Sequence, residues 1–391
     1  MSKILLSTDI GSDIDDALAL QVMFNHPEIN LSGIYTVNDK MDVRPFIAKH
    51  MVNSSGRNIP VAKGESRALS GVEPYYYFED CVVDDIYIDE EESDHGPEVV
   101  FKPFEKVGIT SDGGEDLASR LEKERHVVFS IAPLTNVAKL LQEHPESTNN
   151  IERLYVMGCR FPDDNERVLE HNVKYDADAA NLVFESDIPI TIVTGNLCEK
   201  YRMPSEMLEQ LEGGSGKYVK KMARSFLATK TAQKFISTMI QGINLEDLLR
   251  NHIKVGKGLI NVEDMDERLK LYKMKDSLLV NLNDLYFAAL SGDEYFEQFN
   301  ALIEHLKDSR LDYKEGDMIV EALRGLVPKN ISIADVYVPY CYLHPNKLKI
   351  DKGIIRCDRE GGSYLSSGDK HEIITDIDYE DFKEFLGEYL K

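Results

Sequence analysis

The chain has 391 residues, with 45 Lys and Arg against 69 Asp and Glu, a formal net charge of −24. Such an acidic chain repels the phosphates that nucleic-acid-binding proteins neutralise with clustered Lys and Arg, so we expect no nucleic-acid partner. Its 42% hydrophobic and 29% charged residues are typical of a globular protein, and no stretch approaches the roughly 18 apolar residues of a membrane span.

Short apolar runs alternate with segments of helical periodicity along the first 200 residues. Strands are predicted at Lys3–Thr8, Leu31–Val37, Val127–Ala132, Leu154–Gly158 and Ile188–Thr194, and helices at Asp15–Phe24, Asp42–Met51, Asn136–Glu143 and Asp176–Phe184. Nearly continuous apolar strands that alternate with helices are typical of a parallel sheet covered on both faces. We therefore predict an α/β fold with an open, mostly parallel central sheet.

The remaining segments break this alternation. Acidic or polar loops are predicted at Val83–Glu98 and Gly213–Lys217, helices at Lys217–Met239 and Asp284–Leu290, strands at Ile333–Leu343 and Leu348–Cys357, and an amphipathic helix at Tyr379–Leu390. No composition shift marks a linker. We predict a single domain, 1–391, with insertions near 83–98 and 203–260.

The N-terminal sequence and the cysteines indicate the compartment. MSKILLSTDI lacks the apolar run of about 7–15 residues and the cleavage site of a secretory signal. The five cysteines are far apart, with no zinc-binding spacing; they are Cys81, Cys159, Cys198, Cys341 and Cys357. We expect a cytoplasmic protein with reduced thiols and no membrane partner.

Four carboxylates follow the first predicted strand: Asp9, Asp13, Asp15 and Asp16, around Gly11. The carboxyl ends of strands in an open parallel sheet are where ligands bind. Carboxylates this close together repel each other, so either some are protonated or a cation lies among them. Oxygen ligands without Cys or His favour calcium or magnesium, and calcium suits a flexible set better. Helix capping is the alternative role for the last three.

The segment resembles the N-terminal signature of the nucleoside hydrolases of the inosine–uridine-preferring group, DTDxGxDDAxAL. Here Ser7 replaces the first Asp, and two additional residues precede Asp15 and Asp16. Further segments resemble family motifs in family order: Ile34–Asp39, Pro60–Gly64, His95-Gly96, Ile131–Asn136, Met157–Cys159, Glu170–Asn172, Asp176–Ala180 and Asn283-Asp284. The resemblance extends to about residue 290 and implies a Rossmann-like nucleoside hydrolase fold with helical insertions.

The resemblance also implies a Ca²⁺ site and a ribose pocket. The implied metal ligands are Asp9, Asp16, the backbone carbonyl of Ile131, and Asp284. Asp9 would also be the general base that takes a proton from a metal-activated water. The implied ribose contacts are Asp15, Asn38, Asp39, Met157, Glu170 and Asn172. Helix capping for Asp284, and a surface location for Glu170 and Asn172, are the structural alternatives.

Activation of the leaving base is the step at which the sequence departs from the family. Asn283 stands where the family has a histidine, and an amide can donate a hydrogen bond to the base but cannot protonate it. His95 is a second candidate for this role. The chain has no Trp, so stacking on a base must use Tyr or Phe.

The leading hypothesis is hydrolysis of the N-glycosidic bond of a ribonucleoside to ribose and free base, as in purine or pyrimidine salvage. The alternative is a catalytically impaired, metal-dependent protein of the same fold that binds a ribosyl ligand. A third hypothesis, a magnesium-dependent phosphotransferase or prenyl-diphosphate enzyme, fits less well because the aspartates follow a strand. The expected partner is a small-molecule nucleoside or riboside, and the resemblance implies a homodimer or homotetramer.

Overall fold

The structure is a computed structural model that describes residues 1–11, 13–39, 42–72, 88–93, 96–162, 168–223, 226–227, 230, 253–255, 258–260 and 328–391. The chain divides into two compact units, Met1–Met222 with Asn330–Lys391, and Ala223–Lys329. In the second unit, β11 (Ile253–Val255) pairs antiparallel with β12 (Gly258–Ile260). The single-domain organisation and its insertions stay predictions.

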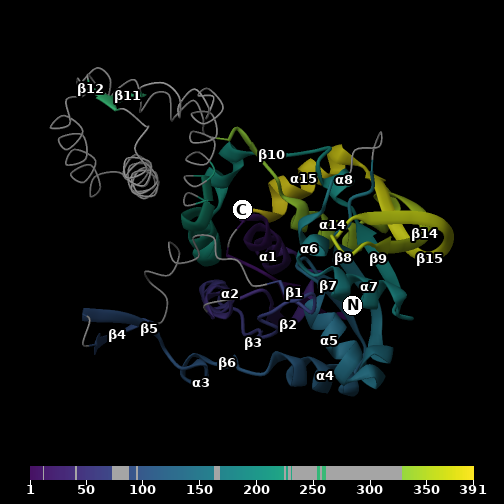
Figure 1. The fold of residues 1–391 in the computed structure, drawn as a ribbon, viewed down its shortest axis with the longest axis horizontal. Helices are drawn as coiled ribbons and strands as arrows, with labels where there is room; N and C mark the ends of the chain where they lie inside the picture. Colours follow the sequence, from purple (N-terminus) through teal and green to yellow (C-terminus); the bar gives the residue numbers. More distant parts are fainter. Residues whose placement is uncertain are drawn as a thin grey trace. The chain divides into compact units, whose positions relative to one another are not determined.

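A nine-stranded sheet organises the first unit, in the order β14-β15-β9-β8-β7-β1-β2-β3-β6. The strands are β1 (Lys3–Thr8), β2 (Asn30–Thr36), β3 (Val61–Lys63), β6 (Ile109–Thr110), β7 (His126–Ser130), β8 (Ile151–Met157), β9 (Ile190–Val193), β14 (Leu348–Cys357) and β15 (Ser363–Ile377). All neighbours are parallel except β14 and β15. The predicted open, mostly parallel α/β sheet is confirmed, with the β14–β15 hairpin at one edge (Figure 1).

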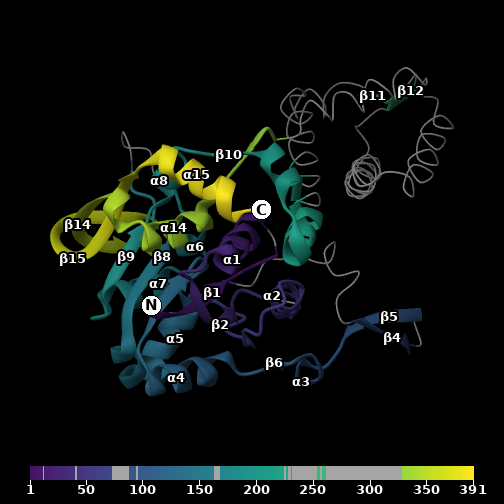
Figure 2. The same cartoon turned by 180° about the vertical axis from the view of Figure 1, so that it is seen from behind.

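Helices cover both faces of the sheet. On one face, α4 (Gly113–Lys123), α5 (Thr135–Glu143) and α7 (Ala177–Glu185) share a core with Leu5, Val128 and Leu154 of the strands. Side chains alternate along a strand, so Phe129 points to the opposite face, where its ring lies 5.3 Å from that of Tyr342 in α14 (Tyr337–Leu343). There α1 (Asp15–Asn25) contacts α14 and α15 (Tyr379–Tyr389) (Figures 1 and 2).

The remaining elements are short or lie beside the sheet. They are α2 (Val43–Ser54), α3 (Phe104–Val107), α6 (His171–Tyr175), α8 (Gly195–Cys198), the 3-10 helices η2 (Pro145–Asn150), η3 (Ser205–Gln210), η4 (Ala334–Val336) and η5 (Pro345–Lys347), and the antiparallel pairs β4 (Ile88–Ser93) with β5 (Gly96–Phe101) and β10 (Met203–Pro204) with β13 (Asn330–Ile331). None of the helices among the described residues is long and apolar enough to cross a membrane.

The predicted strand at Ile333–Leu343 is wrong, because η4 and α14 occupy this segment. Most of its residues are buried, and a short apolar run that is buried all round carries no periodicity to separate strand from helix. Pro339 lies in the first turn of α14, where its missing N–H leaves no helical hydrogen bond unmade.

Two predicted loops are also partly wrong. Within Val83–Glu98, β4 and β5 form an antiparallel pair, because backbone hydrogen bonds between strands do not depend on side-chain polarity. Residues 213–223 are helical; there Val219 is fully buried, and packing outweighs the low helix propensity of glycine. The predicted helix at Lys217–Met239 is confirmed to residue 223, and Asp284–Leu290 lies outside the described residues.

The strand order reverses direction beside β1. From β1 the chain proceeds outward through β2, β3 and β6, and it then returns to β7 on the other side of β1 before it continues outward to β8 and β9. In open α/β sheets, ligands bind outside the carboxyl ends of the strands at such a reversal. The fold therefore directs attention to the residues that follow β1 and β7.

Asn136 forms hydrogen bonds at the carboxyl ends of three neighbouring strands. Its Nδ2 donates to Ser7 Oγ at 3.0 Å and to the Thr36 carbonyl at 3.2 Å, and its Oδ1 accepts from the Glu65 N–H at 2.8 Å. These contacts join the ends of β1, β2 and β3. The asparagine of the Ile131–Asn136 segment thus holds these three strand ends together.

We expect Asn136→Ala to lower the free energy of unfolding by about 3 kcal/mol, because buried backbone and hydroxyl groups lose their partners. Urea denaturation measures this change. Asn149→Ala, at an exposed asparagine, is the control and should alter stability by less than about 0.5 kcal/mol. Equal effects of the two substitutions would contradict the bridging role.

Candidate functional site

The aspartate-rich segment connects β1 to α1 at this reversal of the strand order. Asp9 directly follows β1, and Gly11 makes the turn with φ of 137°, a conformation that favours glycine. Asp15 and Asp16 form the first turn of α1, where carboxylates interact favourably with the helix dipole. The predicted strand, turn and helix are therefore present, with Asp13 exposed and Asp16 buried.

A carboxylate trio joins residues that are far apart in the sequence. It consists of Asp15 and Asp16 from α1 and Asp335 from the C-terminal part of the chain. One oxygen from each lies within 4.8 Å of the others. Asp335 comes from η4, which packs against α1. Among the described residues, this trio is the one group of His, Cys, Asp or Glu with such spacing.

Burial makes the trio electrostatically costly. The Asp16 and Asp335 side chains are 5% and 4% exposed. Burial raises the pKa of each carboxyl well above its usual range, and the charges of neighbouring aspartates raise it further. Carboxylates held this way are stable when protonated or when a cation neutralises them. The trio can therefore hold a metal ion with oxygen ligands.

Asp9 lies beside the trio. Its charge contributes to raising the pKa values of Asp16, Asp335 and Glu170. Asn38 Nδ2 donates to Asp9 Oδ2 at 3.4 Å. Asp9 is only partly buried, so part of the residue is open to solvent.

A buried arginine supports the Asn38 side of the site. Arg44 is 1% exposed, and its Nε donates to the Asn38 carbonyl at 2.8 Å. The Asn38 backbone is left-handed, with φ of 57°. Asp39 accepts from the N–H groups of Val43 at 3.2 Å and Arg44 at 2.9 Å, and so caps α2. Of the two predicted sugar contacts, Asn38 donates a hydrogen bond to Asp9, whereas Asp39 caps the N-terminus of α2.

The predicted ribose contacts after β8 also lie together. Glu170 caps α6 by accepting from the N–H groups of Asn172 at 2.9 Å and Val173 at 3.0 Å. Asn172 Nδ2 donates to the Met157 carbonyl at 3.2 Å. Burial, with a smaller contribution from the charge of Asp9, raises the pKa of Glu170 to about 7. Glu170 is thus a carboxyl group that can change protonation near neutral pH.

This raised pKa predicts that the stability of the protein in chelator, without bound metal, depends on pH. Folded Glu170 binds its proton more tightly than the unfolded residue, so its contribution to stability is greatest below pH 4.5 and is lost as pH rises to about 7. The loss amounts to up to about 3 kcal/mol. Glu170→Gln removes the titration. We therefore expect the free energy of unfolding of the Glu170→Gln variant, relative to that of the unmodified chain, to increase from pH 5 to pH 8. Urea denaturation measures both values. A difference that stays constant with pH would contradict this.

Ile131 follows β7, and its N–H donates to the Ser7 carbonyl at 3.0 Å. This places it next to the end of β1, and its role as a backbone ligand stays a prediction. Three other predicted residues lie outside the described part of the chain: His95, Asn283 and Asp284.

Asp335 is the residue that sequence reasoning missed. The available signal was a single acidic residue inside a long apolar run, ISIADVYVPY. An Asp that an apolar run buries needs a partner. Because the run was interpreted as a strand, its Asp had no evident relation to Asp15 and Asp16.

Comparison with known proteins identifies relatives of this chain. The family model described as "Inosine-uridine preferring nucleoside hydrolase" matches residues 4–384. "Probable uridine nucleosidase 2" of Arabidopsis thaliana is 27% identical over 226 residues, 55% of this chain and 66% of that protein. "Pyrimidine-specific ribonucleoside hydrolase RihA" of Shewanella oneidensis is 30% identical over 214 residues, 53% of this chain and 63% of that protein. The matches thus span slightly under two thirds of these relatives.

Solved structures share the fold at low sequence identity. The plant nucleoside hydrolase PpNRh1 superposes with a TM-score of 0.60 at 14% identity, covering 100% of this chain and 98% of that one. The type III effector protein XopQ, solved with adenosine diphosphate ribose, superposes with a TM-score of 0.57 at 14% identity, covering 100% and 93%. These similarities confirm the α/β architecture.

Proposed function

Because the chain belongs to the inosine-uridine preferring nucleoside hydrolase family, we propose that it hydrolyses the N-glycosidic bond of a ribonucleoside to ribose and free base. The observation that carries the proposal is the Asp15, Asp16 and Asp335 trio beside Asp9. The trio lies at the sheet edge where ligands bind in open α/β folds. The family is metal-dependent, and this buried acidic cluster is suited to a metal ion.

We propose Ca²⁺ as that ion. Calcium binds carboxylate and carbonyl oxygens at about 2.3–2.6 Å, so oxygens up to 4.8 Å apart can share one ion. Asp16, Asp335, Asp9 and the Ile131 carbonyl are the proposed ligands. Asp335 takes the place that the resemblance gave to Asp284, which lies outside the described residues. When bound, the ion would lower the pKa of a water and hold the ribose hydroxyls.

The remaining steps are assigned to the chain's own side chains. Asp9 accepts a proton from the water that attacks the anomeric carbon, and its bond from Asn38 orients it. Asp15, Asn38, Glu170 and Asn172 bind the ribose hydroxyls. The Met157 carbonyl holds the Asn172 side chain, and Asp39 holds the first turn of α2. Nearby carboxylates stabilise the positive charge that develops on the sugar. Asn283 and His95 stay the candidates on the leaving-base side.

A reducing-sugar assay tests the proposal. Inosine, uridine, cytidine, adenosine and guanosine are incubated with the full chain in calcium and in chelator. We expect calcium-dependent ribose release, with uridine among the substrates because the named relatives act on pyrimidine nucleosides. Equal release in calcium and chelator would contradict a role for the metal.

The second candidate is a catalytically impaired protein that binds a ribosyl ligand. It is favoured by the XopQ neighbour solved with adenosine diphosphate ribose and by Asn283 in the family's histidine position. Calcium-dependent binding of a nucleoside or of adenosine diphosphate ribose, without release of ribose from any nucleoside, would support this candidate over hydrolysis. A cytoplasmic location and a homodimeric or homotetrameric assembly stay predictions, the latter testable by light scattering.

A further inference from the structure

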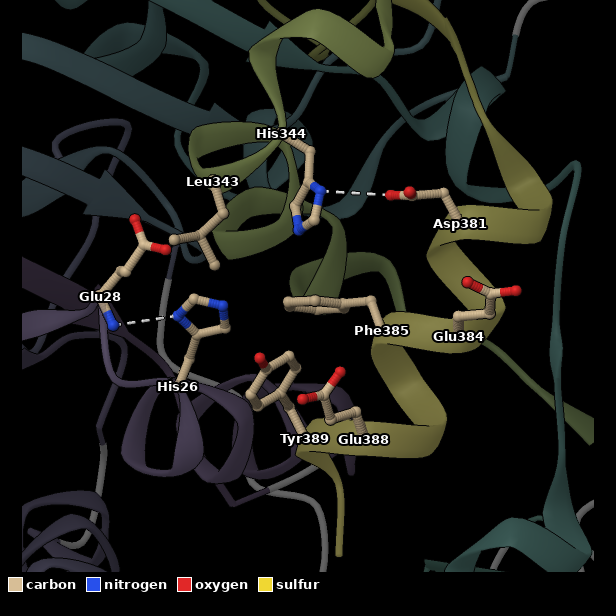
Figure 3. A pocket seen from close by; sticks show the side chains of 9 residues that line it. All are labelled: His26, Glu28, Leu343, His344, Asp381, Glu384, Phe385, Glu388 and Tyr389. Carbon is tan, nitrogen blue, oxygen red and sulfur yellow. Dashed lines mark hydrogen bonds and ion pairs between the residues drawn. The ribbon is translucent and has the colours of Figure 1, made fainter.

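A pocket lies beside the connection from α1 to β2, near the amino-terminal end of β2. Its volume is about 260 Å³, and α1 and α14 end beside it (Figure 3). Because α1 runs from the carboxyl edge of β1 to the start of β2, this pocket is remote from Asp9. It is therefore independent of the proposed hydrolytic site.

One face of α15 supplies most of the pocket wall. Asp381, Glu384, Phe385, Glu388 and Tyr389 line it, and their spacing of three and four residues places them on one side of a helix. The rings of Phe385 and Tyr389 lie 5.3 Å apart, and His26 lies 4.3 Å from Tyr389. Aromatic rings and carboxylates thus face the same space.

Three of the carboxylates are uncompensated. Asp381 accepts from Tyr340 at 3.0 Å and pairs with His344 at 3.2 Å and Lys347 at 3.0 Å. Glu28, Glu384 and Glu388 are exposed, and none of them pairs with a Lys or Arg in the described part of the chain. The pocket therefore presents a negative rim.

His26 places a hydrogen-bond donor in the pocket. It is 6% exposed, and its Nδ1 accepts from the Glu28 N–H at 3.2 Å. A neutral imidazole whose Nδ1 accepts must carry its proton on Nε2. Figure 3 shows this second nitrogen turned toward the side where Phe385 lies, and among the described residues it has no hydrogen-bond partner.

We propose that this pocket binds an arginine side chain of a polypeptide partner. A guanidinium is a planar cation that stacks on aromatic rings and pairs with carboxylates. Its adjoining peptide carbonyl would accept from His26 Nε2. The volume is below the 300–1,000 Å³ or so of most small-molecule sites, which fits a single side chain. No trio of metal-ligating groups within 4.8 Å is found here among the described residues.

NMR titration of the full chain tests the proposal with two compounds of nearly the same shape. N-acetylarginine amide carries a positive charge, and N-acetylcitrulline amide is uncharged. We expect the arginine compound to bind at least about tenfold more tightly, and its affinity to fall with added salt. Butylguanidine, which has the guanidinium and the same single charge but no carbonyl, should bind more weakly than the arginine compound.

Paired variants locate the binding. Glu384→Gln with Glu388→Gln should weaken arginine binding about tenfold, whereas Glu380→Gln, on the same helix but outside the pocket, should not. Unchanged melting temperatures show that the variants fold. Equal binding of the citrulline compound, no binding of the arginine compound, or full binding by the double variant would each overturn the proposal. Butylguanidine that binds as tightly as the arginine compound would overturn the peptide contact of His26.

Discussion

Replacing Asp9 by Asn is expected to lower the rate of ribose release by about 10²–10⁴-fold, the contribution typical of a general base. An amide oxygen can still accept the hydrogen bond from Asn38, but the amide cannot take a proton from water. The fold should therefore be retained while turnover is lost. The measurement is kcat for ribose release at saturating calcium, with the melting temperature of each protein as a check on folding.

Asp13→Asn is the matched control for this experiment. Asp13 lies in the same turn and is exposed, so its substitution removes one charge from the same segment without touching the trio. We expect kcat to change little. If Asp9→Asn retains nearly full turnover, or if both variants lose activity equally, the general base must be another group.

Replacing Asp335 by Asn is expected to change stability in opposite directions with and without calcium. In chelator, the variant should be more stable than the unmodified chain, because a buried carboxyl surrounded by Asp15, Asp16 and Asp9 is removed. In calcium it should lose most of the stabilisation that the ion gives, about 2.7 kcal/mol when the ion is present at 100 times its Kd. Thermal unfolding at graded calcium concentrations measures both effects.

These opposite changes in stability, with and without calcium, distinguish a metal ligand from a residue that only packs. A residue that only packs η4 against α1 would, when replaced, destabilise the protein with and without calcium alike. The Asp284→Asn variant belongs in the same series, because the resemblance assigned the distant ligand to Asp284. Calcium stabilisation that disappears with Asp284→Asn and survives Asp335→Asn would return the assignment to Asp284.

Neighbouring residues were sufficient to predict the local structure around Asp9. The apolar run at β1, the glycine turn and the apolar periodicity of α1 are all properties of neighbouring residues, which patterns along the chain report directly. The position of Asp9, Asp15 and Asp16 at a strand end followed from them. The family resemblance was carried by the same contiguous motifs.

Which distant groups complete the site is visible only in the folded chain. Asp335 joins Asp15 and Asp16 because η4 packs against α1, and Asn136 links three strand ends that are far apart in the chain. The apolar segment at 333–343 could form strand or helix by its own pattern, and packing on several sides selected the helix. Local patterns record the preferences of neighbouring residues, whereas burial and long-range pairing depend on which segments the whole chain brings together.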